Sequence, residues 1–172
     1  MGAPGQLGNG SSPRSRDGSA SRMIDRAHVG FATAPSSVTV DAFRVRLFCE
    51  ATGEVDRIYY DEVAARASGY PRCPVPTTYL KVLENEHFNA ARVLQHLGVP
   101  LRGVLHGEQS FEIRLPIYIG DTVAIDRRIV DIADKKNGAL TIVTMDTCFR
   151  LGGVEAATSR QTIVVRNALS AS

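Results

Sequence analysis

The sequence lacks features that would each define a class of protein. It has no run of about 18 apolar residues, which excludes a predicted transmembrane helix and indicates a soluble chain. It also lacks a cluster of Lys and Arg interleaved with aromatic residues, and basic and acidic side chains are balanced outside residues 1–22. Because nucleic-acid binding requires clustered cations that face phosphates, we expect neither a nucleic-acid nor a membrane partner.

Cysteine is scarce. Cys49, Cys73 and Cys148 are widely spaced, odd in number and include no C-x-x-C pair, which argues against a disulfide framework and favours a reducing cytoplasm. No His-x-x-x-His or Cys–His spacing is present. We therefore expect no metal site and no cofactor.

The ends of the chain differ in composition from its middle. Residues 1–22 are rich in Gly, Ser and Pro and lack the apolar segment of a signal peptide, so they predict a disordered tail. Residues 23–168 have the length of one domain, and 169–172 form a second predicted tail.

The first half of the chain has helical hydrophobic periodicity. Asp41 is a predicted N-cap of a helix that ends near Gly53 and has Phe43, Leu47 and Phe48 on its apolar side. A short helix is expected over 61–69. A longer helical stretch, from about 77 to 97, is expected to be interrupted around Asn85.

The second half changes to strand periodicity. Four strand-length segments are separated by turn residues: 104–117, 121–134, 139–151 and 154–166. Consecutive strands with short turns predict an antiparallel meander. Helices followed by strands indicate an α+β domain, in which a curved antiparallel sheet packs against one helix of about 20 residues.

Several segments resemble the N-terminal domain of MaoC-like dehydratases, also described as the fatty-acid-synthase-like dehydratase domain. They are "HVGF" at 28–31, "EATGEVDRIYYDEVAARASGY" at 50–70, "PVPTTY" at 74–79, "LHGEQSFEIRLPIYIGD" at 105–121 and the final "TIVVR". The resemblance spans about residues 28 to 166. It implies a hot dog fold, in which a curved sheet wraps around a long central helix.

The resemblance also implies an activity. Members of the wider family hydrate trans-2-enoyl thioesters or dehydrate (R)-3-hydroxyacyl thioesters of CoA or acyl carrier protein, using the Asp and His of a motif similar to G-D-x-N-P-x-H. In this chain Gly53 is retained, but Glu54, Asp56, Arg57 and Tyr59 stand where that motif has Asp, Asn, Pro and His.

Glu54 and Tyr59 differ in how well they could serve as catalytic groups. A phenol with an ordinary pKa of about 10 is a poor substitute for histidine near pH 7, so Tyr59 is expected to contact substrate instead. Glu54 keeps a carboxylate and is a candidate catalytic residue, although its longer side chain shifts that group by roughly an ångström. Alternatively, Glu54 and Asp56 form a solvated turn that caps the helix over 61–69.

Further candidates lie in two other segments. His106 is the second candidate catalytic residue, and Gln109 is expected to border the acyl-thioester channel. Period-two alternation would place His106, Glu108 and Ser110 on one face of their strand, and Gln109 with Phe111 on the other.

Pro76 and Thr77 begin the central helix, where Thr77 or Thr78 is a predicted cap. The N–H groups at this end are suited to hold a thioester oxygen. His87 and His96 are expected to be surface or capping residues.

Three functions remain open at this level. The first is the substrate-binding subunit of a hydro-lyase, paired with a second hot dog subunit that carries the Asp and His. The second is an autonomous hydratase or thioesterase that uses Glu54 or His106. The third is a non-enzymatic module that binds acyl thioesters. Acyl-CoA or acyl-ACP is the expected ligand in each case, and edge strands favour a heterodimer or homodimer over a monomer.

Overall fold

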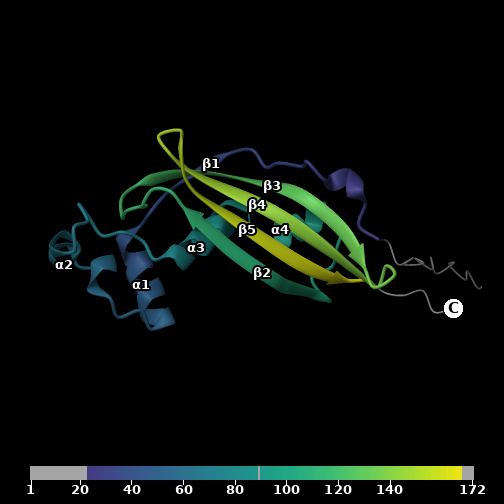
Figure 1. Cartoon of the computed structure of the whole chain (residues 1–172), viewed down its shortest axis with the longest axis horizontal. Helices are drawn as coiled ribbons and strands as arrows, with labels where there is room; N and C mark the ends of the chain where they lie inside the picture. The colour runs from purple at the N-terminus through teal and green to yellow at the C-terminus, as the bar shows by residue number, and fades with distance from the viewer. Residues whose placement is uncertain (1–22, 89, 168–172) are drawn as a thin grey trace, which may run out of the picture.

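A five-stranded antiparallel sheet and a line of helices on one of its faces make up the protein, which is described here by a computed structural model covering residues 23–88 and 90–167. The predicted tails at 1–22 and 169–172 lie outside the described residues. The strands are β1 (Ser36–Thr39), β2 (Val104–Ile113), β3 (Thr122–Lys135), β4 (Leu140–Leu151) and β5 (Val154–Arg166). The α+β prediction and the four long strands are confirmed, with boundaries within a few residues (Figure 1).

The strand order corrects the predicted meander. The sheet has the order β1-β3-β4-β5-β2, so β3, β4 and β5 form a meander but β2 pairs with β5 at the edge. The segment between β2 and β3 is long enough to cross to the other side of the sheet, and it buries Ile117 on the way. The short loops between later strands allow only hairpins.

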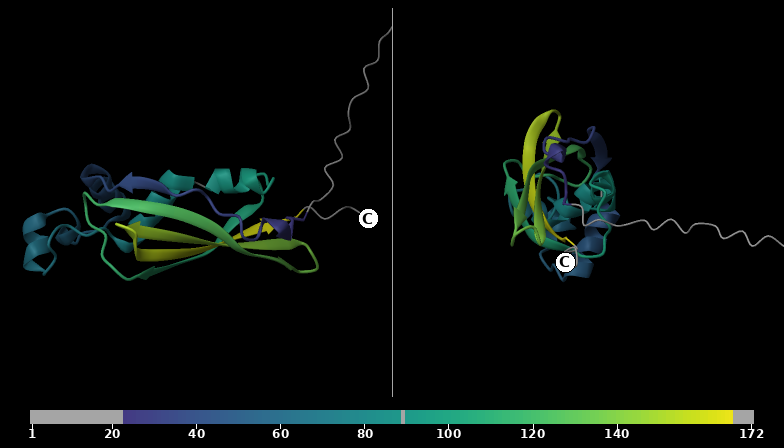
Figure 2. Two further views of the ribbon diagram at one scale, coloured as in Figure 1. Left: turned by 90° about the horizontal axis from the view of Figure 1, so that it is seen from above. Right: turned by 90° about the vertical axis from the view of Figure 1, so that its right-hand side faces the viewer.

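The helices are η1 (Arg26–His28), α1 (Ala42–Thr52), η2 (Arg57–Tyr59), α2 (Glu62–Ala67), η3 (Thr77–Tyr79), α3 (Leu80–Phe88) and α4 (Ala90–His96). Figure 2 shows α3 and α4 lying along one face of the sheet, with α1 and α2 grouped at one end. None of the helices within the described residues is long and apolar enough to cross a membrane.

Helix α1 begins and ends where the sequence predicts. The Asp41 carboxylate accepts a hydrogen bond from the Arg44 amide, and Gly53 ends the helix at φ +72°. The predicted apolar face is confirmed at Phe48, which packs against a buried apolar cluster, and is wrong at Phe43 and Leu47, which are exposed. Val45 and Cys49 are buried instead. Periodicity gives the spacing of a buried face, but the position of the sheet determines which face is covered.

The central helical stretch lies where the sequence predicts it. Within the described residues, η3 and α3 run from Thr77 to Phe88, and α4 covers Ala90–His96. The interruption expected around Asn85 is wrong, because Asn85 lies inside α3. Burial of Leu83 and Glu84 against the sheet holds this turn in a helical conformation.

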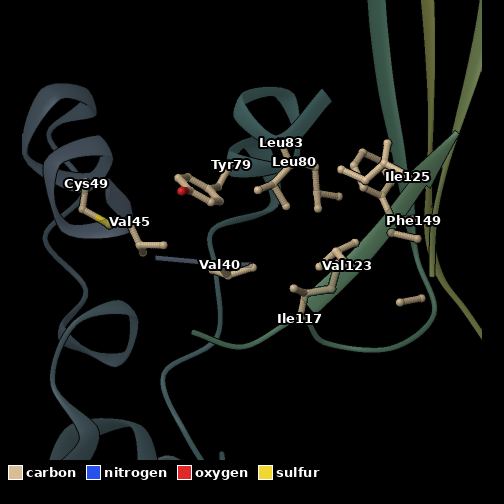
Figure 3. Close-up of a cluster of buried hydrophobic side chains, with 12 residues drawn as sticks. Val40, Val45, Cys49, Tyr79, Leu80, Leu83, Ile117, Val123, Ile125 and Phe149 are labelled. Atoms are coloured by element: carbon tan, nitrogen blue, oxygen red, sulfur yellow. The ribbon is translucent and has the colours of Figure 1, made fainter. Parts of the chain in front are cut away.

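Two apolar clusters fill the space between helices and sheet. The first lies toward α1 and contains Tyr79, Leu80, Leu83, Ile125 and Phe149 among its buried members (Figure 3). The second lies toward α4 and contains Val93, Leu94, Ile129, Met145 and Ile163. The interior is therefore divided along the length of the sheet.

Candidate functional site

A pocket of about 160 Å³ lies between η2, the start of the central helix and the end of β2. Most of the residues around it are apolar, among them Leu80, Ile113 and Ile117, and Tyr59, Tyr70 and Thr77 add hydroxyl groups. Tyr59 and Thr77, two of the predicted substrate-binding residues, lie in the same pocket. Two segments that are 18 residues apart in the sequence therefore meet at one site.

Tyr59 occupies the position where the related motif has histidine. Its ring is half-buried against the first apolar cluster. Burial raises the pKa of the phenol, and the negative charges of Glu54 and Asp56 raise it further. Tyr59 is therefore neutral near pH 7 and can donate a hydrogen bond, but it cannot serve as a general base there.

Pro76 precedes the central helix at the N-cap position and is buried. The predicted caps are wrong, because Thr77 and Thr78 lie inside η3 and no side chain caps its first N–H groups. A proline has no polar side chain to offer those groups. Uncapped N–H groups beside an apolar pocket are suited to a carbonyl oxygen of a ligand.

Glu54 lies in a separate hollow of about 140 Å³, together with Arg46, Cys49, Glu50 and Tyr60. Its Oε1 accepts a hydrogen bond of 3.0 Å from the Asp56 amide. This hollow and the Tyr59 pocket share no lining residue. The carboxylate thus stabilises the turn that follows α1.

Two aspartates in the segment after Glu54 cap the helices η2 and α2. Asp56 accepts a hydrogen bond from the Ile58 amide at 3.1 Å and caps η2. The expectation that Glu54 and Asp56 cap the next helix is wrong, because Asp61 caps α2 by accepting from the amides of Val63 and Ala64. Asp61 is the nearer acid in sequence, and its side chain reaches those amides directly.

A β-bulge in β2 changes the predicted faces of that strand. His106 pairs with Ile163 and Glu108 pairs with Thr162, so Gly107 is an extra residue without a partner. The bulge places His106 on the same face as Gln109, and His106 Nε2 lies 3.4 Å from Gln109 Oε1. The strict alternation predicted for this strand is therefore wrong at Gly107.

Gln109 reaches into the interior from this edge strand. Its amide nitrogen donates to the buried Ser159 hydroxyl and, at 3.4 Å, to the Arg160 carbonyl. His106 is exposed, and it lies near the beginning of β2 while Ile113 of the pocket lies at its end. At about 3.3 Å per residue this separation is roughly 20 Å. The structure does not bring His106 and Glu54 into one site.

His87 and His96 both lie on the central helical segment. His87 is half-buried and contacts the hydroxyls of Thr33 and Ser36, at 2.8 Å for Thr33. His96 is exposed at the end of α4 and stacks on Phe31 at a centroid distance of 3.6 Å. Among the described residues no group of three His, Cys, Asp or Glu is placed to hold a metal ion.

Sequence reasoning missed a set of polar side chains inside the protein. Glu84 of α3 is fully buried, and so are Arg127 of β3 and Gln161 of β5. Two signals were available. Glu84 follows the buried Leu80 by four residues, and Arg127 continues the inward alternation of Val123 and Ile125.

The sequence and fold agree with those of known proteins. A UPF0336 protein of Saccharopolyspora erythraea is 29% identical over 148 residues, which are 83% of this chain and 92% of that protein. The HadBC (3R-hydroxyacyl-ACP dehydratase) complex of Mycobacterium tuberculosis matches with a TM-score of 0.70 at 19% identity, covering 80% of this chain and 96% of that one. A protein titled MaoC-like dehydratase matches with a TM-score of 0.71 at 23% identity, covering 83% and 43% respectively.

The structural matches establish the fold, and the sequence match establishes the family. The model of the FAS1-like, dehydratase domain region matches residues 27–158, which include the turn after α1, the central helix and most of the sheet. This chain therefore belongs to the family of the FAS1-like, dehydratase domain region, and it has the hot dog fold of its structural matches.

Proposed function

We propose that this chain is the substrate-binding subunit of a hydratase or dehydratase that acts on trans-2-enoyl or (R)-3-hydroxyacyl thioesters of CoA or acyl carrier protein. A second hot dog subunit supplies the catalytic Asp and His. The observation that carries the proposal is the combination of an apolar pocket with a neutral Tyr59 in place of histidine. The pocket can hold an acyl group, but its own side chains include no general base suited to pH 7.

The start of the central helix supports binding of the thioester itself. Thr77 lines the pocket, and the first N–H groups of η3 have no side-chain cap. A thioester oxygen placed there would accept from these groups, and negative charge that develops on it would be stabilised. In this arrangement Tyr59, Pro76 and Thr77 bind substrate, and the acyl chain lies on the apolar lining.

The edge strand β2 supports pairing with a second subunit. Its outer backbone groups have no neighbouring strand among the described residues, and Leu105 and Ile113 on it are 62% and 46% exposed. Such an edge is a ready template for another chain. His106 and Gln109 lie on this strand, and we assign them to the part of the channel that the partner completes. The structural match HadBC is titled a complex, which supports the same assembly.

The test compares the lone chain with a reconstituted pair. The partner should be a MaoC-like subunit from the same genome with an intact Gly-Asp-x-Asn-Pro-x-His motif. Hydration of crotonyl-CoA is measured as the loss of its enoyl absorbance. It should be negligible for either subunit alone and robust for the pair. Robust turnover by the lone chain that Glu54→Gln abolishes would overturn the proposal and establish an autonomous enzyme.

A matched pair of variants tests the binding role. Thr77→Val should raise the KM of the pair for crotonyl-CoA several-fold, because it alters a side chain that lines the pocket. Thr78→Val is the control, since it changes the next residue of η3, which does not line the pocket. Equal effects of the two variants would show that the pocket is not the acyl site.

A further inference from the structure

Six polar side chains cross the interior between the two apolar clusters, and we name them the polar belt. They come from α3 and three neighbouring strands: Lys81, Glu84, Arg127, Thr147, Ser159 and Gln161. The sheet pairs Arg127 with Thr147 and Thr147 with Ser159, so the belt runs straight across β3, β4 and β5. All of its members except Lys81 are buried.

Hydrogen bonds and charges connect the helix side of the belt to the sheet side. Lys81 Nζ lies 2.6 Å from Glu84 Oε2 and 3.1 Å from Gln161 Oε1. Arg127 donates to Gln161 through Nη2 and to the Phe88 carbonyl through Nη1, the latter at 3.2 Å. The belt is therefore a connected layer of charge within an otherwise apolar interior.

The belt follows the acyl pocket along the central helix and along β2. On the helix, Thr77 and Leu80 line the pocket, and Glu84 follows Leu80 one turn later on the same face. On β2, Ile113 lines the pocket, and Phe111 and then Gln109 follow it on the same face. Gln109 donates to Ser159 of the belt, so both segments lead from the pocket to the belt.

We propose that the polar belt closes the inner end of the acyl site and limits the acyl group to about six carbons, a statement that rests on the proposed function. The size of the pocket agrees with this limit. Its volume is about 160 Å³, and an apolar cavity of about 150 Å³ accommodates benzene, a ligand of six carbons. A longer chain has to pass Glu84.

Passage across the belt is unfavourable for an alkyl chain. Arg127 Nε and Thr147 Oγ1 are buried and have no hydrogen-bond partner among the described residues. Methylene groups cannot satisfy such atoms, and they would also separate Lys81 and Arg127 from the Glu84 carboxylate. The six-carbon limit thus follows from charge as well as from volume.

Binding of saturated acyl-CoA thioesters to the full chain tests the limit. Butanoyl-, hexanoyl-, octanoyl- and decanoyl-CoA are titrated by calorimetry. Each buried methylene should strengthen binding about fourfold up to hexanoyl-CoA, and the affinity should then stop rising. Affinity that continues to rise through decanoyl-CoA would overturn the limit while leaving the proposed function intact. Failure of every thioester to bind, alone and in the reconstituted pair, would overturn both.

A variant without the belt charges tests the cause. Lys81→Met, Glu84→Leu, Arg127→Met and Gln161→Leu together replace the connected part of the belt with apolar side chains of similar volume, an exchange that proteins often tolerate. The combined variant should extend the rise in affinity to octanoyl- and decanoyl-CoA. An unchanged plateau at six carbons in a folded variant would overturn the role of the belt.

Two further variants complete the experiment. Asp146→Asn with Arg160→Gln removes an ion pair from the opposite face of β4 and β5, and it should leave the plateau at six carbons. Leu80→Ala shortens a side chain that lines the pocket one turn before Glu84, and it should move the plateau to a longer chain. This second change keeps the proposal testable if the belt variant does not fold, and an unmoved plateau would contradict it.

Discussion

Lys81 and Glu84 form an ion pair of 2.6 Å inside the protein, and Arg127 approaches the same carboxylate oxygen to 3.9 Å. Burial by itself would raise the pKa of the Glu84 carboxyl, but the charges of Arg127 and Lys81 outweigh it and lower that pKa. Glu84 is therefore ionised at neutral pH. One carboxylate holds two cations in place between the apolar clusters.

Removal of this carboxylate should be costly. Glu84→Ala leaves Arg127 buried without its counter-charge, and we expect the free energy of unfolding to fall by about 3–5 kcal/mol. Glu86→Ala is the matched control on the same helix, because Glu86 pairs with the exposed Arg44 and such pairs contribute about 0–1 kcal/mol. Urea unfolding measures both, and similar losses would contradict the structural role of the belt.

His87 should make stability depend on pH. Burial lowers the pKa of its imidazole, an effect that Arg127 and Arg92 reinforce and Asp126 opposes. Because the folded-state pKa lies below the unfolded value of about 6.5, the contribution of neutral His87 is fully present above that pH. It is lost as the pH falls from there through the folded-state pKa.

The His87→Gln variant checks this dependence. Its urea midpoint should decline less than that of the wild type between about pH 7 and pH 5. Some decline should remain, because burial and His28 also lower the pKa of His96. A slope unaffected by His87→Gln would show that this imidazole does not contribute.

The bulge at Gly107 should tolerate no larger residue. A Cβ atom at this position would lie 2.8 Å from Thr162 Oγ1 and 3.3 Å from Val164 Cγ2. Gly107→Ala should therefore lower the free energy of unfolding by about 1–3 kcal/mol. Adding Thr162→Ala removes the nearest atom and should recover part of the loss. Strict additivity of the two substitutions would argue against this contact.

His106 and Gln109 should differ in their effects on stability. Gln109→Ala leaves the buried Ser159 hydroxyl without its amide donor and should cost about 1 kcal/mol. His106→Ala changes an exposed side chain and should stay within about 0.5 kcal/mol of the wild type. Both should weaken acyl-CoA binding by the reconstituted pair if they border the channel. Normal binding by both folded variants would remove them from it.

Local features of the structure could be predicted from the sequence where neighbouring residues decide them. Asp41 and Gly53 predicted the ends of α1, because a cap side chain and a left-handed glycine act on neighbouring backbone groups. Turn residues and period-two alternation predicted the four long strands, because these signals also depend on residues that are near one another in the sequence. Five short segments, of which His106 to Asp121 is the most specific, together indicated the family, because a motif can be compared without knowledge of the fold.

Contacts between side chains of distant elements depend on how the helices and the sheet pack. The pairing of β2 with β5 depends on a long crossing connection, and Gly107 reverses the faces of His106 and its neighbours through contacts with another strand. The burial of Glu84 depends on two cations that approach its carboxylate, Lys81 from the helix layer and Arg127 from the sheet. The spacing of residues along the chain predicts contacts within one helix or strand. Contacts between distant elements cannot be predicted from it, because they form only when the helices pack on the sheet.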